Sequence, residues 1–283
     1  MQPAKTFILT SLAMIAFAGN SLLCRLALKT TSIDAASFTT IRLISGAVVL
    51  CLIVQVKGKG QPGKASWLSA FALFVYAAGF SFAYRYVSAA TGALLLFGAV
   101  QATMISYGFS NGERFQKLQW LGLSIAIAGF IGLLLPGLAT PPLEGSLLML
   151  LAGIAWGIYS LRGKTHGNPL QTTSGNFLRA APMALVCSLW MMDGMQLDYS
   201  GIAFAFCSGA LTSGMGYVIW YAALPALKAT TAATVQLAVP VITAIGGIVL
   251  LDEPVSLLLI FASAAILGGI ALIIMAKRRN ELH

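Results

Sequence analysis

The sequence predicts an all-α polytopic membrane protein, on grounds of composition and length. Hydrophobic residues make up 58% of the 283 residues and charged residues only 9%, and the mean hydropathy is +0.88. A soluble domain is about 25% charged and needs more polar surface than this chain can supply. A membrane-spanning helix takes roughly 20 apolar residues, so this length allows about ten helices and leaves no room for a separate soluble domain.

Ten apolar runs are long enough to cross a bilayer, and short connections rich in Gly, Pro and charge separate them. They lie at residues 6–24, 36–56, 66–84, 91–110, 118–135, 143–161, 172–192, 201–223, 230–251 and 255–276. The first run has too long an apolar core for a signal peptide and is expected to remain as a span.

Lys and Arg are distributed unevenly between the two sides of these spans. If the N-terminus is cytoplasmic, the segments on that side hold twelve basic residues: Lys5, Lys57, Lys59, Lys64, Arg114, Lys117, Arg162, Lys164, Lys228, Lys277, Arg278 and Arg279. The opposite side holds only Arg25, Lys29 and Arg85. The positive-inside rule therefore predicts an inner (plasma) membrane protein with both termini in the cytoplasm. The net charge of +9 follows from these loops and does not indicate a nucleic-acid partner.

The second half of the chain repeats landmarks of the first half in the same order. The paired landmarks are Ser37 to Arg42 with Ser174 to Arg179, Tyr84 with Tyr221, Glu113 with Glu253, and Gly129 with Gly269. We therefore expect two five-helix repeats, at residues 1–137 and 138–283. Because each repeat has an odd number of spans, two consecutive copies must lie in the membrane with opposite topology. Inverted repeats of this kind are common in secondary transporters.

Several short motifs accompany this repeat. They are Phe17-Ala18-Gly19-Asn20, Arg42, Gly112-Glu113-Arg114, Ala155-Trp156-Gly157-Ile158-Tyr159, Pro240-Val241 and Leu251-Asp252-Glu253-Pro254. In their order and spacing, over essentially the whole chain, the sequence resembles the EamA-type transporters of the drug/metabolite transporter superfamily. The resemblance implies a ten-helix bundle whose central cavity is lined mainly by helices 1, 3, 4, 6, 8 and 9. It also implies movement of small metabolites, commonly amino acids or amphiphilic compounds and often as efflux.

Arg42 and Arg179 are the basic residues that fall inside spans. A charge there is costly, so an intramembrane ionisable residue is a functional candidate by default. One interpretation is that they capture a substrate carboxylate or form a gate. The other is that they snorkel to the interface or cap a neighbouring helix, and their symmetric placement fits both.

Uncharged polar and aromatic side chains supply the other candidates for substrate binding. The amides are Asn20 and Gln101, which could instead bond another helix. The aromatics are Tyr76, Phe80, Trp156, Tyr159 and Tyr217, which follow helical spacing and could stack a ring or cage a cation. Packing alone would explain the same pattern. Tyr84 and Trp220 lie nearer span ends, where an interfacial aromatic belt is the better interpretation.

Some chemistry is not indicated by the sequence. No carboxylate or histidine lies in the middle of a span, where proton relays usually place them. The sequence predicts no enzyme, no cofactor and no metal site, and the four isolated cysteines predict no disulfide. The expected partners are a small-molecule substrate and the lipid bilayer, with the protein as a monomer or a homodimer.

The sequence therefore leaves two classes of function as alternatives. The favoured one is a transporter of small organic solutes that works by alternating access, with amino acids first among the substrates and lipophilic cations or drugs as the alternative. The other is a channel-like membrane protein. A narrow channel favours rings of charge or of carbonyl groups, whereas the candidate lining here is aromatic and amide-bearing.

Overall fold

A computed structural model describes residues 3–57, 65–112, 116–135, 141–163, 168–223, 226–227 and 235–280. Within these ranges all regular structure is helical. The long helices are α1 (Pro3–Thr30), α2 (Ala35–Val56), α3 (Trp67–Ala83), α4 (Ala89–Ser110), α5 (Lys117–Leu134), α6 (Leu143–Gly163), α7 (Pro169–Trp190), α11 (Ala238–Leu251) and α12 (Leu257–Asn280). Short helices α8 (Tyr199–Cys207) and α9 (Gly216–Ala223) flank the π-helix η2 (Ser208–Met215), and η1 (Met192–Gly194) is a single 3₁₀ turn.

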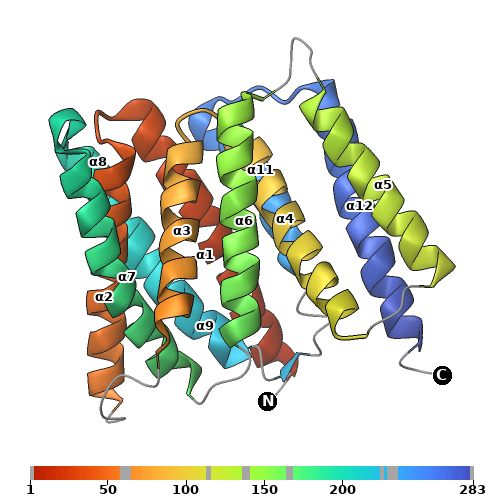
Figure 1. Cartoon of the computed structure of the whole chain (residues 1–283), viewed down its shortest axis with the longest axis horizontal. Coiled ribbons are helices and arrows are strands. Elements are labelled where there is room, and N and C mark those ends of the chain that lie inside the picture. The colour runs from red at the N-terminus through yellow and green to blue at the C-terminus, as the bar shows by residue number, and fades with distance from the viewer. Residues whose placement is uncertain are drawn as a thin grey trace.

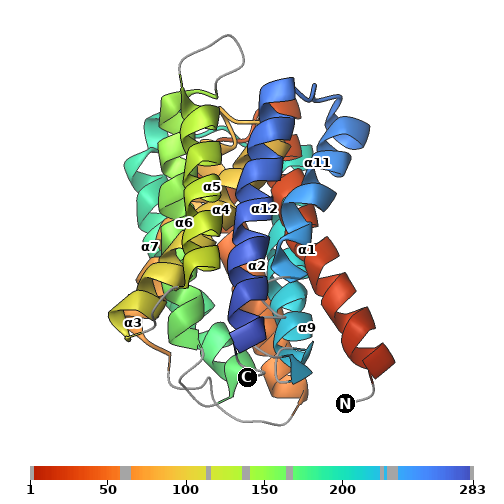
Figure 2. The same ribbon diagram turned by 90° about the vertical axis from the view of Figure 1, so that its right-hand side faces the viewer.

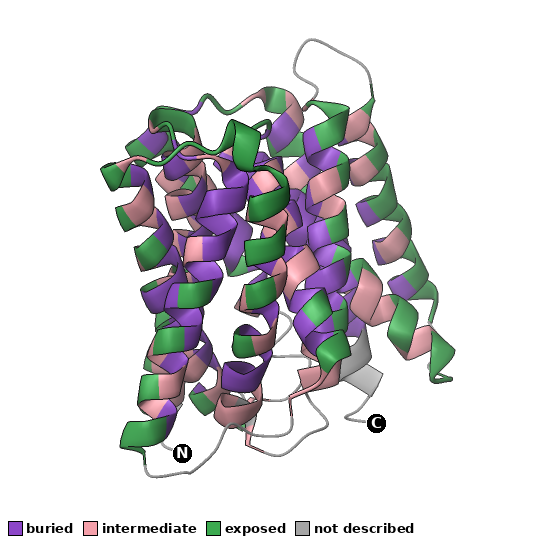
Figure 3. Ribbon diagram, turned by 60° about the vertical axis from the view of Figure 1, so that its left-hand side comes forward, coloured by how far each residue is buried: buried purple, intermediate pink, exposed green. Residues whose placement is uncertain are grey.

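The all-helical membrane architecture predicted from the sequence is confirmed. Seven of the helices are long and apolar enough to cross a membrane, counting α8, η2 and α9 as one, while α3 and α11 are apolar but shorter. Large apolar side chains such as Phe7, Trp190 and Phe261 are mostly exposed, and Figure 3 shows the exposed positions gathered on the outer faces of the helices. Such a surface suits contact with lipid rather than water. The exact number of ten crossings stays a prediction.

The helices stand side by side, and α1 begins at the end of the bundle where α12 finishes (Figures 1 and 2). Glycines allow neighbouring helices to approach closely. A Cβ at Gly79 of α3 would press on the Leu148 carbonyl of α6, and one at Gly153 of α6 would collide with Leu96 of α4. Helices α5 and α12 pair at one edge of the bundle, where Gly122 faces Gly269. In a membrane such small-residue contacts drive helix association, because lipid provides little hydrophobic force between helices.

The helix that runs from α8 to α9 is interrupted by the π-helix η2. A π-helix widens the turn and is frequent at functional sites. Here it lies against α2, where a Cβ at Gly209 would collide with the Arg42 carbonyl and with Ser45. The close approach sets Ser213 of η2 within 3.3 Å of the Arg42 side chain. The sequence indicated a span at 201–223 but not this change of helix type.

Polar residues cap several helix starts, as expected for backbone donors that have no partner inside their own helix. Asp34 is the clearest case. Its Oδ1 accepts a hydrogen bond from the Ser37 backbone N at 2.9 Å, its Oδ2 accepts one from Gln196 N at 3.0 Å, and its own N–H donates to the Gln196 carbonyl. Asp34 therefore caps α2 and ties it to the connection before α8.

We expect Asp34→Ala to lower the free energy of unfolding by about 1–2 kcal/mol at neutral pH, since it removes a helix cap. Burial opposes ionisation of Asp34, but the hydrogen bonds from Ser37 and Gln196 outweigh it and lower its pKa. The depressed pKa means that the carboxylate stabilises the fold above its unfolded pKa of about 3.9, and that this contribution is lost as pH falls through the folded pKa.

Thermal unfolding in detergent at neutral and acid pH measures this difference. The exposed Asp193 on the same connection provides the control, and Asp193→Ala should leave the unfolding temperature unchanged. A deficit in Asp34→Ala that persists below the folded pKa would contradict the assignment to the ionised carboxylate.

Candidate functional site

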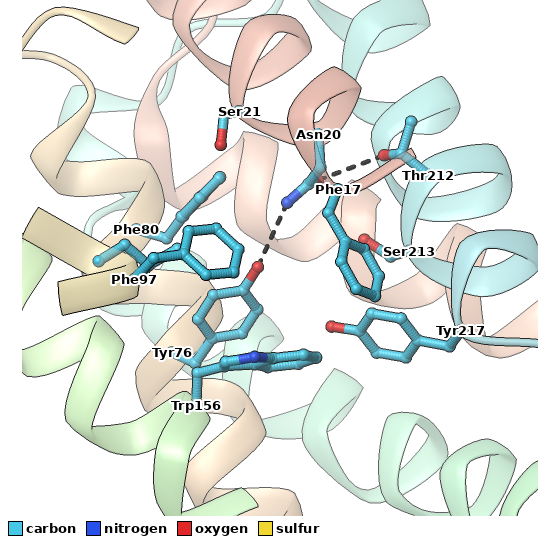
Figure 4. A pocket seen from close by; sticks show the side chains of 11 residues that line it. Phe17, Asn20, Ser21, Tyr76, Phe80, Phe97, Trp156, Thr212, Ser213 and Tyr217 are labelled. Atoms are coloured by element: carbon cyan, nitrogen blue, oxygen red, sulfur yellow. Dashed lines mark hydrogen bonds between the residues drawn. The ribbon is translucent and has the colours of Figure 1, made fainter. Parts of the chain in front are cut away.

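The centre of the bundle contains a small buried cavity with aromatic walls (Figure 4). Helices α1, α3, α4, α6, η2 and α9 all contribute to it. The lining residues are Phe17, Asn20, Ser21, Tyr76, Phe80, Leu96, Phe97, Trp156, Thr212, Ser213 and Tyr217. The cavity has a volume of about 20 Å³, which is room for about one water molecule. Both halves of the chain thus form its wall.

Trp156 is the centre of the aromatic wall. Its ring lies 4.8 Å from Tyr76, 5.1 Å from Tyr217 and 6.4 Å from Phe17, measured between ring centroids. Tyr76 in turn lies 5.5 Å from Phe80. These rings come from four different helices, and pairs at such distances favour one another by about 0.5–1.5 kcal/mol beyond burial. The wall is therefore a mutually packed set that presents ring faces and edges to the cavity.

A hydrogen-bond network forms the polar part of the wall. Asn20 donates from Nδ2 to the Tyr76 hydroxyl at 3.3 Å, and its Oδ1 accepts bonds from Ser208 at 2.7 Å and Thr212 at 3.4 Å. In Figure 4 the Asn20 amide points at the Tyr76 hydroxyl, and the Tyr217 hydroxyl points into the space beside Trp156. The Tyr217 hydroxyl has no hydrogen-bond partner among the described residues. The network joins α1, α3 and η2 and leaves one hydroxyl available.

Arg42 lies directly behind this wall and is 1% exposed. Its Nη2 donates to the Tyr76 hydroxyl at 3.0 Å and its Nε to Ser213 at 3.3 Å. Its guanidinium carbon lies 5.1 Å from the Tyr76 ring centroid and 4.8 Å from that of Phe80. The snorkelling interpretation is therefore wrong for Arg42, because its side chain turns into the protein interior and not towards the membrane surface.

Arg179 occupies a different environment from its repeat mate. Its Nη1 donates to the Gly175 carbonyl of its own helix at 3.1 Å, and its guanidinium carbon lies 5.7 Å from the Trp67 ring centroid. The side chain is half-buried, and it lies outside the residues that line the cavity. Arg179 thus bonds a carbonyl inside its own helix and caps no neighbouring helix in the contacts described, so the two arginines are equivalent in the sequence but not in the structure.

The structure brings most of the predicted binding residues together. Asn20, Tyr76, Phe80, Trp156 and Tyr217 line the cavity. The two others, Tyr159 and Gln101, lie outside the residues that line it.

Tyr159 packs on Trp156 at 5.5 Å between ring centroids. Gln101 lies one turn beyond Phe97 on α4 and is buried with an Nε2 that has no described partner.

The interpretation of Tyr84 and Trp220 as part of an interfacial aromatic belt is wrong. Their side chains are 0% and 8% exposed and pack on Phe80 and Phe17, respectively.

Six lining residues were not singled out as candidates: Phe17, Ser21, Leu96, Phe97, Thr212 and Ser213. The repeat carried a signal for Phe17, because Phe17 lies 139 residues before Trp156, close to the offset of the paired landmarks. Thr212 carried no such signal, because a Thr in a helix commonly bonds a carbonyl of its own helix and need not face a cavity. The Thr212 hydroxyl does bond the Ser208 carbonyl, at 2.8 Å.

An ion pair closes the end of the bundle where α1 finishes. Arg25 Nε lies 2.7 Å from Glu253 Oε1, and Glu253 Oε2 accepts a bond at 2.7 Å from the backbone N of Ala89, the first residue of α4. Arg25 Nη1 also donates to the Tyr84 carbonyl. Glu253 therefore caps the start of α4 and pairs with Arg25. Its repeat mate Glu113 lies outside the described residues.

Comparisons with known proteins agree with this architecture. The EamA-like transporter family matches residues 4–135 and 143–275. A Pseudomonas aeruginosa protein described as uncharacterized is 52% identical over 98% of this chain and 97% of its own length.

An uncharacterized transporter of Archaeoglobus fulgidus is 27% identical over 82% of this chain and 84% of its own. YoaV, an uncharacterized transporter of Bacillus subtilis, is 25% identical over 82% and 85%. A solved crystal structure with 17% identity has the same fold, with a TM-score of 0.69 over 98% of this chain and 99% of that one. The chain belongs to the EamA-like transporter family, and it is a multi-pass membrane transporter.

Proposed function

We propose that this transporter exports small amphiphilic organic solutes, amino acids among them, across the inner membrane by alternating access. The observation that carries the proposal is the central cavity, whose wall combines Phe17 and Tyr76 from one half of the chain with Trp156 and Tyr217 from the other. Sites formed where two halves of a transporter meet, near mid-depth, are common to secondary transporters. Ring faces with a few polar groups suit a solute that has an apolar body and a polar end.

The size of the cavity supports a mechanism that requires movement. A cavity of about 20 Å³ holds about one water molecule and is too small for an amino acid. A solute therefore requires the helices around the cavity to separate, as they would in a protein that opens to each side in turn. The π-helix η2 and the hydroxyl-rich network at Asn20 offer packing that can change without breaking a large apolar core.

The two family matches, over residues 4–135 and 143–275, support a division into repeats at 1–137 and 138–283. With five crossings each, these repeats would be inverted and would exchange roles between the inward-open and outward-open states. The number of ten crossings, the inverted relation and the outward direction of transport belong to this proposal.

Flux from liposomes tests the function. Purified protein would be reconstituted into liposomes, and separate liposome samples would be loaded with amino acids, purines or cationic dyes. We expect protein-dependent efflux of solutes that combine an apolar or ring portion with a polar end. Passive permeation that is unchanged by the protein, for every solute in the panel, would contradict the proposal.

Topology gives an independent prediction. With both termini cytoplasmic, a reporter fused after His283 should behave as cytoplasmic and one inserted at Pro141 as external, because the twelve basic residues named above favour the inner side. Paired enzymatic reporters active on opposite sides of the membrane measure this directly. Exchanged signals at the two positions would overturn the orientation.

A further inference from the structure

Several hydrogen-bond donors at and behind the cavity wall have no partner among the described residues. Arg42 Nη1 and the Tyr217 hydroxyl have no hydrogen-bond partner among the described residues. The Tyr76 hydroxyl accepts bonds from Asn20 and Arg42, and its own proton is donated to no described residue. The amide oxygen of Asn20, by contrast, already accepts from Ser208 and Thr212.

The charged groups around the cavity are of one sign only among the described residues. Arg42 carries a permanent positive charge at 1% exposure. No acid lines the cavity, and the ion pair within the described ranges is the remote one between Arg25 and Glu253. The rings of Tyr76 and Phe80 give Arg42 partial compensation. A buried cation whose Nη1 has no partner, and which faces no carboxylate among the described residues, is an environment that favours an anion.

We propose that the solute site recognises a carboxylate, which Arg42, Tyr76 and Tyr217 would bind, while the apolar body of the solute packs on the aromatic wall around Trp156. This inference rests on the proposed function and names its substrate class as monocarboxylates with an aromatic or bulky apolar part. An ammonium group on the solute adds little to binding, because no carboxylate lines the cavity and the Arg42 charge repels it. Amino acids then bind through their carboxylate, and lipophilic cations are excluded.

Three compounds with the same phenyl ring and two-carbon chain separate these cases. They are 3-phenylpropionate, phenylalanine and phenethylamine, which carry an anion, both charges and a cation. Their binding to purified protein in detergent would be measured by calorimetry and by thermal stabilisation, independently of flux. We expect 3-phenylpropionate to bind at least as tightly as phenylalanine, and phenethylamine not to bind at millimolar concentration.

Variants of the two arginines provide the matched test. Arg42→Gln should weaken 3-phenylpropionate binding at least about tenfold, since a charge-assisted hydrogen bond is lost. Arg42→Lys should retain part of the affinity because it keeps the positive charge. It should lose the rest because the ammonium lacks the planar arrangement of donors of the guanidinium. Arg179→Gln removes the same charge outside the cavity and should bind as the unchanged protein does.

The results distinguish this inference from the proposed function. Phenethylamine binding as tight as that of 3-phenylpropionate, binding of phenylalanine alone, or no binding by any of the three overturns the carboxylate site. So does unchanged affinity in Arg42→Gln. The ranking of the three compounds on the unchanged protein decides the question even where Arg42→Gln does not fold. Efflux of other solutes with no carboxylate preference would leave the transporter function in place and remove only the inference.

Discussion

Trp156→Ala should weaken solute binding by about tenfold or more, with loss of transport at low solute concentration. The side chain is 9% exposed and has ring contacts to Phe17, Tyr76, Tyr159 and Tyr217. A stacked aromatic contact is worth about 0.5–1.5 kcal/mol beyond the apolar area that it buries, and 1.4 kcal/mol corresponds to tenfold. Removal of the indole therefore takes away the largest surface on which a solute ring could pack.

Concentration-dependent flux in liposomes, together with calorimetric binding, measures this effect. Trp156→Phe keeps a ring and should show a smaller loss, which distinguishes a binding defect from a folding defect. Trp120→Ala is the control, because Trp120 is 53% exposed on α5, a helix that contributes no residue to the cavity wall. Normal affinity in Trp156→Ala, or an equal loss in Trp120→Ala, would count against this cavity as the solute site.

The helices themselves could be predicted well from the sequence. Runs of about 20 apolar residues have few alternatives in a membrane, because each backbone N–H and C=O must be bonded within the segment. The deep aromatics could also be predicted, since Tyr76 and Phe80 follow helical spacing and Trp156 stands mid-span. The family resemblance indicated which helices line the central cavity. That was enough to predict that these aromatics, which lie on different helices, would meet there.

The environment of Arg42 could not be predicted in the same way. The repeat makes Arg42 and Arg179 equivalent, and the sequence contains no signal to separate snorkelling from burial. The difference comes from neighbours that are distant in the chain. Tyr76 and Ser213 meet Arg42, whereas Arg179 meets Trp67 and its own helix. Ser213 reaches Arg42 because the π-helix and Gly209 bring η2 close to α2, and small residues carry no periodic signal for that change of helix type.

Glu253→Gln should lower the free energy of unfolding by about 3 kcal/mol while leaving energy coupling intact. The carboxylate is 7% exposed and has two partners, Arg25 Nε and Ala89 N, both at 2.7 Å. Gln is neutral, so Arg25 loses its counter-charge, and the single amide oxygen cannot accept from both Arg25 and the Ala89 N–H that begins α4. Breaking one partner of a buried ion pair typically costs about 3–5 kcal/mol.

Thermal unfolding in detergent measures the stability of this variant, and Glu144→Gln is the matched control. Glu144 is an exposed acid in the first turn of α6, so its substitution should change stability by well under about 1 kcal/mol. The ratio of gradient-driven accumulation to downhill exchange should be the same in Glu253→Gln as in the unchanged protein, because Glu253 caps a helix and pairs with Arg25 at the bundle end. A stable Glu253→Gln protein that exchanges solute normally but no longer accumulates it would instead make Glu253 a proton carrier.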